Sequence, residues 1–436
     1  MAPIILAGLI HSTRSVNIIN PTSTADYFAA QWVNPGDIFS ILLLLGPEVI
    51  QQAVAQLAGR QITPMAFSFG WVAYAVKALL AAVGDGKLMP PAENANTLVI
   101  PAGSGHSRTT TSWVLSRLLR DTSDRLDEDM KGEAPHQMTG SWETWHPSFW
   151  RSTMGLESKV EPPSRPWEAL RIAVYEVVDD EKVVHGLPTR DMIWISGFVV
   201  IVVQLLIAAI PWIVNNEWGT FLITSYGIIL ALAESSLPQW RREKWACPRK
   251  GGPTVTLTEG NGSRFAMVIL GKKNVGLDLD ILARGTRTAP ASRLTRLGTS
   301  FLTLNWMILL VLATGLKIDT WYILGVGALG SIHNITCAAR PRSAGALGIH
   351  IREKGEVIRG LRVADALKTA EELYPGVGVS LVPVFFPGSM RIQEPDFEFW
   401  RNARDRVMAP NRWGTRMDSL PPPPKYDNCD STEAEK

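Results

Sequence analysis

The sequence predicts an α-helical polytopic membrane protein of about six spans, arranged as three hairpins, with a composite cytosolic α/β portion. Several windows of about 20 residues are nearly free of charge, which is the length that an α-helix needs to cross a bilayer. Long polar stretches separate these windows, and basic residues gather beside several of their ends. The chain holds 43 Lys and Arg residues against 41 Asp and Glu residues, so its overall charge does not indicate a nucleic-acid partner.

Two hairpins in the second half of the chain carry the clearest spans. The first arm, residues 192–214, contains Gln204 as its only strongly polar residue and has a tryptophan near each end. The second arm follows after a short connection, so the chain must turn back at once. Residues 299–339 repeat this pattern with two shorter arms. The four predicted spans are residues 192–214, 218–237, 299–316 and 320–339.

Residues 38–83 are predicted to form the remaining hairpin, with arms at residues 38–59 and 62–83. The second arm is apolar except for Lys77, whereas the first is strongly apolar only in its first half. Its second half has polar residues at every fourth position, which form one stripe on a helix. The stripe consists of Glu48, Gln52 and Gln56.

An antiparallel hairpin brings Glu48 close to Lys77, because their depths differ by only roughly 6 Å at 1.5 Å per residue. Ionisable groups at such depth are costly and tend to pair or to line a polar pathway. Three interpretations remain open. The two residues form a structural ion pair, they belong to a substrate or proton site, or the first arm is an amphipathic helix in the membrane plane with no such pair.

Basic residues set the predicted orientation, because Lys and Arg beside spans are retained on the cytosolic side. A basic cluster follows residues 218–237, whereas the short connections within the hairpins hold few basic residues. Both termini and all long polar segments are therefore predicted to be cytosolic, with the spans in the endoplasmic reticulum or the plasma membrane. The cluster is interpreted as a topology anchor, suited to contact with anionic lipids. It consists of Arg241, Arg242, Lys244, Arg249 and Lys250.

These assignments divide the chain into seven segments. The segments are an N-terminal arm at 1–37, the first hairpin at 38–83, a mixed α/β segment with a partly disordered middle at 84–191, the second hairpin at 192–237, a basic β-hairpin segment at 238–298, the third hairpin at 299–339, and a tail at 340–436 that is disordered from about 419.

The polar segments contain strand and helix patterns of their own. Because an isolated hairpin is marginal in water, strands from separate segments are expected to join in one small sheet. The predicted strands lie at residues 97–102, at 171–178 and, as a pair, within 254–270, and the helices predicted to cover them lie at 111–126 and 361–374.

Polar residues inside the spans are the candidate site residues. A cluster of them around a central cavity would suit a transporter or a membrane-embedded enzyme. Hydrogen bonding between helices explains the same residues equally well. The histidines and cysteines lack the spacing of metal ligands, so no metal and no cofactor is expected. The candidates are Gln204 and Asn305, deep in their spans, and Glu234, His333 and Asn334, near the cytosolic ends.

Two short motifs are read in their context. Gly325, Gly327 and Gly330 match the GxGxxG pattern, but they lie inside a predicted span with no soluble strand before it, which favours close helix contact over dinucleotide binding. Asn261 and Asn334 each begin a glycosylation sequon. Both are expected to stay unmodified, because the first is predicted to be cytosolic and the second to lie in or near the membrane.

Most of the chain resembles a largely uncharacterised family of multi-pass membrane proteins from filamentous fungi. The resemblance is carried by ITPMAFSFGWVAYAVKALLAAVGDGKLMP, by SLPQWRREKWACPRK with the TVTLTEGNGSRFAMVILG that follows, and by TWYILGVGALGSIHNITCAARPRSAGALGIH. It implies a fungal source and a membrane protein, and it supplies no catalytic residues. Some similar fungal proteins accompany secondary-metabolite gene clusters.

The expected function is that of an accessory membrane component in a fungal secondary-metabolite pathway, holding pathway enzymes or lipophilic intermediates at the bilayer. Large polar segments on one side and the lack of a catalytic signature favour this function. A small-molecule transporter remains open and should show internal repeats. A membrane-embedded enzyme such as a terpenoid cyclase also remains open, with Glu48 and Glu234 as its available acids.

Overall fold

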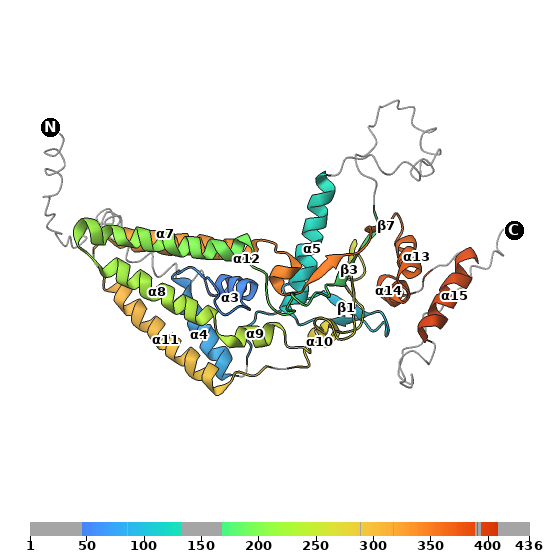
Figure 1. The fold of residues 1–436 in the computed structure, drawn as a ribbon, viewed down its shortest axis with the longest axis horizontal. Helices are drawn as coiled ribbons and strands as arrows, with labels where there is room; N and C mark the ends of the chain where they lie inside the picture. The colour runs from blue at the N-terminus through green and yellow to red at the C-terminus, as the bar shows by residue number, and fades with distance from the viewer. Residues whose placement is uncertain are drawn as a thin grey trace, which may run out of the picture.

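The computed structural model describes residues 46–84, 86–132, 168–287, 289–316, 318–388, 390 and 394–408. These residues form an elongated molecule, with a helix bundle at one end, a mixed sheet in the middle and three helices at the other end (Figure 1). The predicted N-terminal arm, residues 133–167 of the predicted partly disordered middle, and the predicted disordered tail lie outside the described residues.

Four helices in the described part of the chain are long and apolar enough to cross a membrane, which indicates a membrane protein. In length and apolar composition, these helices confirm the four spans predicted between residues 192 and 339. Two of the helices start at capping side chains, because Asp191 accepts from the Trp194 N–H and Ser292 accepts from the Thr295 N–H. The helices are α7 (Met192–Asn215), α8 (Gly219–Ser235) taken together with the short α9 (Pro238–Lys244) that follows it, α11 (Arg293–Thr314) and α12 (Thr320–Ala339).

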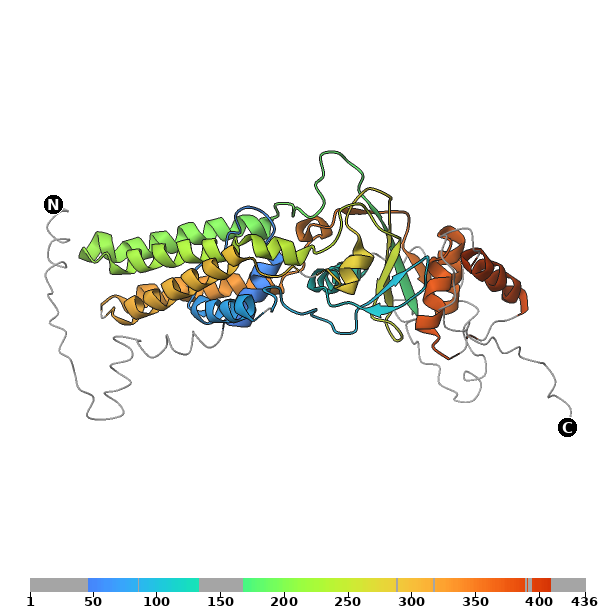
Figure 2. The ribbon, with the colours of Figure 1, turned by 90° about the horizontal axis from the view of Figure 1, so that it is seen from below.

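The described residues contain four helices of spanning length and not the six that were predicted. The predicted span at residues 62–83 is wrong, because its helix, α4 (Gly70–Val83), has only 14 residues, too few to cross a layer of roughly 30 Å at 1.5 Å per residue. The first arm is described only from residue 46, and it contains the 11-residue α3 (Pro47–Leu57). Residues 38–45 lie outside the described residues. Both helices occupy the part of the bundle nearest the sheet (Figure 2).

Residues 62–69 connect α3 to α4 without regular secondary structure, and residues 63–69 are buried. We call residues 62–69 the inserted segment. α12 packs against α3 and α7, whereas α11 packs against α4 and α8, so the predicted third hairpin is not a tightly packed pair. α3 and α4, from the first predicted hairpin, therefore lie between α11 and α12, the two arms of the third.

Strands from three polar segments join one mixed sheet, as predicted. The strand order is β2-β1-β4-β5-β3-β6, β7 also pairs with β3, and only the β3–β5 pair among those described is parallel. The four predicted strands are β1, β3, β4 and β5; the other three were missed because two or three residues carry no readable pattern. The strands are β1 (Leu98–Pro101), β2 (Arg108–Thr109), β3 (Leu170–Val177), β4 (Val255–Thr258), β5 (Phe265–Leu270), β6 (Ile351–Glu353) and β7 (Ile358–Gly360).

The two faces of the sheet pack against different layers, because side chains alternate along each strand. Ala173 and Met267 share one continuous core with α5 and the helix bundle. Ile172 and Val268, one position away on β3 and β5, share a second core with the helices at the far end of the molecule. The predicted covering helices are found as α5 and α13, whereas α14 and α15 were not predicted. These helices are α5 (Trp113–Gly132), α13 (Val363–Leu373), α14 (Val377–Phe385) and α15 (Glu394–Met408).

Candidate functional site

The inserted segment brings peptide groups without helical hydrogen bonds into the apolar interior of the bundle. Such groups cost free energy there unless the protein supplies partners. Gln204 of α7 supplies them, because its Oε1 accepts from the Phe67 N–H at 3.2 Å and its Nε2 donates to the Phe67 carbonyl at 2.7 Å. The same Nε2 donates to the Val326 carbonyl of α12 at 2.9 Å. Gln204 therefore joins two helices to the inserted segment.

Two further spans serve the inserted segment in the same way. The Asn334 amide donates to the Ala66 carbonyl at 3.4 Å and to Ser68 Oγ at 3.2 Å, and Ser235 Oγ donates to the Thr63 carbonyl at 3.0 Å. Asn334 and Ser235 come from α12 and α8. Polar side chains of the spans thus act here as partners of buried peptide groups.

Glycines make room for the inserted segment. A Cβ atom on Gly330 would overlap the backbone carbonyl of Phe67, and a Cβ atom on Gly327 would overlap the ring of Phe69. A Cβ atom on Gly325 would have no atom within 4 Å. Two of the three members of this glycine motif therefore lie in close contact, chiefly with the inserted segment, and Gly330 also lies close to the Gln204 side chain of α7.

The variant Gln204→Leu is expected to lower the free energy of unfolding by about 2–4 kcal/mol. The buried N–H and carbonyl of Phe67 both lose their hydrogen-bond partner in this variant. The measurement is the unfolding free energy of the purified protein in detergent. The control is Asn305→Leu, which removes the hydrogen bond from Tyr226 to a partly exposed side chain. This loss is expected to lower the free energy of unfolding by about 0.6 kcal/mol. Equal losses in both variants would contradict the role assigned to Gln204.

Glu234 is buried among aromatic rings at the end of α8. Its side chain is 1% exposed, and its Oε2 accepts from Trp306 Nε1 at 2.7 Å. The Trp306 ring stacks on the rings of Trp71 and Phe67, with centroids 5.9 and 6.2 Å away. Its second oxygen has no hydrogen-bond partner among the described residues. The carboxyl group therefore lies in a filled aromatic core.

Glu48, the other candidate acid, has a different partner. Its Oε1 lies 3.0 Å from Lys77 Nζ, and the two side chains are 74% and 41% exposed. This geometry matches the first of the three interpretations, a structural ion pair. Such an exposed pair contributes little to stability in water, about 0–1 kcal/mol.

His333 belongs to a group that the sequence did not reveal. Its Nε2 lies 3.1 Å from Ser196 Oγ of α7 and 3.5 Å from Cys337 Sγ, one turn later on α12. A hydroxyl beside an imidazole is the first half of a nucleophilic site. The contact between Ser196 and His333 joins α7 to α12. Asn305, likewise, bonds Tyr226 Oη of α8 at 2.5 Å.

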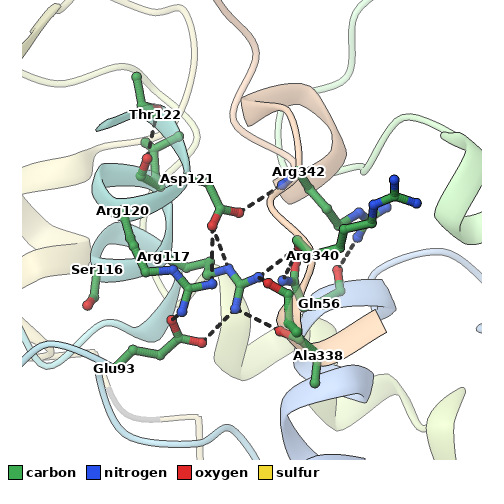
Figure 3. Close-up of polar contacts among 12 residues, drawn as sticks. Gln56, Glu93, Ser116, Arg117, Arg120, Asp121, Thr122, Ala338, Arg340 and Arg342 are labelled. Atoms are coloured by element: carbon green, nitrogen blue, oxygen red, sulfur yellow. Dashed lines mark hydrogen bonds and ion pairs between the residues drawn. The ribbon is translucent and has the colours of Figure 1, made fainter. Parts of the chain in front are cut away.

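A second polar group lies where the bundle meets the sheet (Figure 3). Arg117 of α5 is 1% exposed, and its guanidinium group pairs with Asp121 at 2.8 Å and with Glu93 at 2.9 Å. Burial raises the pKa of Asp121, and Arg117 and Arg120 oppose that rise. The guanidinium group also donates to three carbonyls at the end of α12. These are the carbonyls of Ala338, Ala339 and Arg340, at 2.9, 3.2 and 2.8 Å.

Arg342 extends this group towards the first residues of α7. Its guanidinium group bonds both carboxylate oxygens of Asp191 at 2.7 Å, and its backbone N–H donates to Asp121 at 2.9 Å. Lys244 donates to the carbonyls of Gln56 and Ala58 at 3.1 and 3.0 Å. We call Arg117, Asp121, Asp191, Lys244 and Arg342 the junction cluster. It joins α3, α5, α7, α9 and the chain after α12.

The predicted polar stripe of α3 ends at this junction. Gln52 Oε1 accepts from Trp113 Nε1 at 2.8 Å, and the Gln56 side chain lies against the Arg117 guanidinium group (Figure 3). With Glu48 bonded to Lys77, each residue of the stripe has its own partner. The stripe therefore fixes α3 to its neighbours.

The predicted topology anchor needs one correction. Lys244 is buried, with 1% exposure, because it lies one turn after the buried Trp240 on the same face of α9. It bonds carbonyls in the protein and is no exposed anchor. The four other members are exposed: Arg241, Arg242, Arg249 and Lys250.

Sequence reasoning missed most of the junction cluster, although one signal was present. Arg117 and Asp121 lie four residues apart on the same face of the predicted helix as Val114 and Leu118. Two opposite charges on an otherwise apolar helix face indicate that both side chains are buried and form an ion pair with each other. Asp191 and Arg342 are far apart in the sequence and carry no local signal.

No match to this chain is found among models of protein families, among curated proteins or among solved structures. Functional inference therefore rests on the residues and contacts described above.

Proposed function

We propose that the chain is an accessory membrane protein without catalytic activity of its own, which holds its α/β portion at a membrane surface for pathway enzymes that handle lipophilic intermediates. The observation that carries the proposal is the filling of the bundle. The inserted segment and the rings of Phe67, Trp71 and Trp306 occupy the space between the spans. Transport and cyclisation both need an interior site for a small molecule.

The junction cluster supports the same proposal. Buried ion pairs and hydrogen bonds to α12 carbonyls hold α5, and with it one face of the sheet, against the end of the bundle. A protein that holds pathway enzymes next to one another needs its sheet to keep a fixed position relative to its membrane helices. The proposal that the pathway is a fungal secondary-metabolite pathway comes from the sequence resemblance alone.

The test is deletion of the gene, followed by untargeted metabolite profiling and complementation with variants. An accessory role predicts that deletion lowers the final product, and that both Glu48→Gln and Glu234→Gln restore it fully. Retention of finished product inside the deletion strain would instead indicate transport. An unchanged profile after deletion would remove the metabolic setting altogether.

One observation favours the cyclase as the second candidate. Cationic cyclisation needs an acid beside aromatic faces, and Glu234 is buried against Trp306. The complementation experiment separates the two candidates. A strain with Glu234→Gln that accumulates an uncyclised precursor, as the deletion strain does, would favour the cyclase, provided that the variant protein reaches wild-type abundance.

The proposed orientation places the sheet in the cytosol. Asn261 is exposed in the turn between β4 and β5, so oligosaccharyltransferase could reach it only if the sheet were lumenal. We expect no glycan on Asn261, measured as an unchanged gel mobility after treatment with an endoglycosidase. A mobility shift that Asn261→Gln abolishes would reverse the orientation. Asn334 is 1% exposed and bonded to Ser68, so it is no acceptor in either orientation.

A further inference from the structure

We propose that the junction carries a binding site for a phosphate group, in a hollow lined by Lys87, Lys244 and Arg287, and that its ligand is the phosphate of an anionic lipid headgroup. This proposal goes beyond the accessory function and does not depend on it. It also differs from diffuse attraction to the exposed basic cluster, because it assigns one place and one chemical group.

The hollow has a volume of about 50 Å³ and lies between the bundle and the sheet. Its wall includes the chain after α4, the start of α5, the end of α9 and the chain after α10 (Leu279–Arg284). These are Lys87, Thr111 to Trp113, Glu243 with Lys244, and Arg287. Because Glu243 and Lys244 end the short α9, which directly follows the long apolar helix α8, the proposal places the hollow near the level of the lipid headgroups.

Lys244 is the central observation. Its side chain is 1% exposed, yet no carboxylate lies within 4.0 Å of its Nζ among the described residues. Two carbonyls accept from it, and an ammonium group has three N–H donors. The Trp245 ring centroid lies 5.1 Å from Nζ and the Trp113 centroid 6.0 Å. A buried charge without a counter-charge is costly, and an anion in the hollow beside it would offset that cost.

The other groups of the wall favour an anion as well. Lys87 and Arg287 are exposed side chains at its rim. Thr111 and Ser112 precede Trp113, the first residue of α5, and a helix N-terminus carries partial positive charge. These groups line the same hollow as Lys244, which has carbonyl partners but no carboxylate partner among the described residues.

Glu243 also lines the hollow, and it is already engaged. Its Oε2 accepts from the Met89 N–H at 2.9 Å, and its Oε1 accepts from Gln239 Nε2 at 2.7 Å. It therefore holds the chain after α4 in place, and it forms no ion pair with Lys244 among the described contacts. Against this one engaged carboxylate, the hollow is lined by the exposed cations Lys87 and Arg287 and by the amino group of Lys244.

The test measures lipid binding to the purified full-length protein in an uncharged detergent. Phosphatidic acid is titrated, with phosphatidylcholine as the zwitterionic control and inorganic phosphate as the soluble competitor. The hollow variant combines Lys87→Gln with Arg287→Gln, and the matched control combines Lys273→Gln with Arg362→Gln, two residues outside the predicted topology anchor. Both pairs are exposed and remove the same charge, and only the first pair lines the hollow.

We expect phosphatidic acid to bind the wild type and the control alike, and the hollow variant at least about tenfold more weakly. Displacement of the lipid by inorganic phosphate would support recognition of the phosphate group. Binding of inorganic phosphate without binding of phosphatidic acid would overturn the lipid as the source. Equal affinity in all three proteins, or an equal loss in both variants, would overturn the site. Unchanged unfolding midpoints without ligand verify that the variants are folded.

Discussion

Replacing Gly330 by alanine is expected to destabilise the bundle by about 3 kcal/mol, although alanine is the better helix former. The added Cβ atom would overlap the backbone carbonyl of Phe67. That carbonyl cannot move freely, because Gln204 Nε2 donates to it and holds the N–H of the same residue. The substitution therefore displaces the inserted segment from the interior of the bundle.

The control for this prediction is Gly325→Ala on the same helix. Gly325 has open space where its Cβ atom would lie, so alanine there is expected to stabilise α12 by up to about 1 kcal/mol. The measurement is the unfolding free energy of both variants in detergent, with a probe for helix content. Similar stabilities for Gly330→Ala and Gly325→Ala would show that the inserted segment is not packed against Gly330.

Replacing Arg117 by methionine is expected to cost about 3–5 kcal/mol, because removal of one partner leaves buried charge uncompensated. Asp121 is 1% exposed and Glu93 is 13% exposed, and both lose an ion pair. The last carbonyls of α12 lose their donor as well. Because burial already raises the pKa of Asp121, loss of the guanidinium group should shift that carboxyl further towards its protonated form.

Arg120 provides a matched control on the same helix. It contacts the same two carboxylates, but its side chain is 40% exposed. The variant Arg120→Met is expected to cost no more than about 1 kcal/mol, since water replaces an exposed ion pair. Thermal unfolding of both variants in detergent measures the difference. If Arg120→Met were as damaging as Arg117→Met, total charge and not buried geometry would explain the effect.

The candidate site shows where prediction from the sequence succeeded and where it failed. Gln204 was recognised as a deep polar residue, because a single amide in an apolar run stands out. Its partner was not recognised, because the partner is a backbone group of the inserted segment. Every residue except proline has a backbone N–H, so the sequence does not mark which of these groups needs a side-chain partner. Polar side chains in a span therefore indicate a need for partners without naming them.

The error at residues 62–83 has the same origin. Hydropathy counts apolar side chains, and ITPMAFSFG is apolar enough to be read as part of a span. Hydropathy does not record whether the backbone can leave the helix, which requires that neighbouring helices satisfy its peptide groups. Gln204, Asn334 and Ser235 do so here, by bonding peptide groups of Phe67, Ala66 and Thr63.

The sequence by itself determined the four long apolar helices, the four longer strands and the two helices that cover them, because each is set by a local period or by length. Only the tertiary structure decided that residues 62–69 enter the bundle, that Lys244 is buried, and that Arg117 and Arg342 hold the sheet to the bundle. The physical reason is that these features depend on hydrogen bonds and charges between residues far apart in the chain.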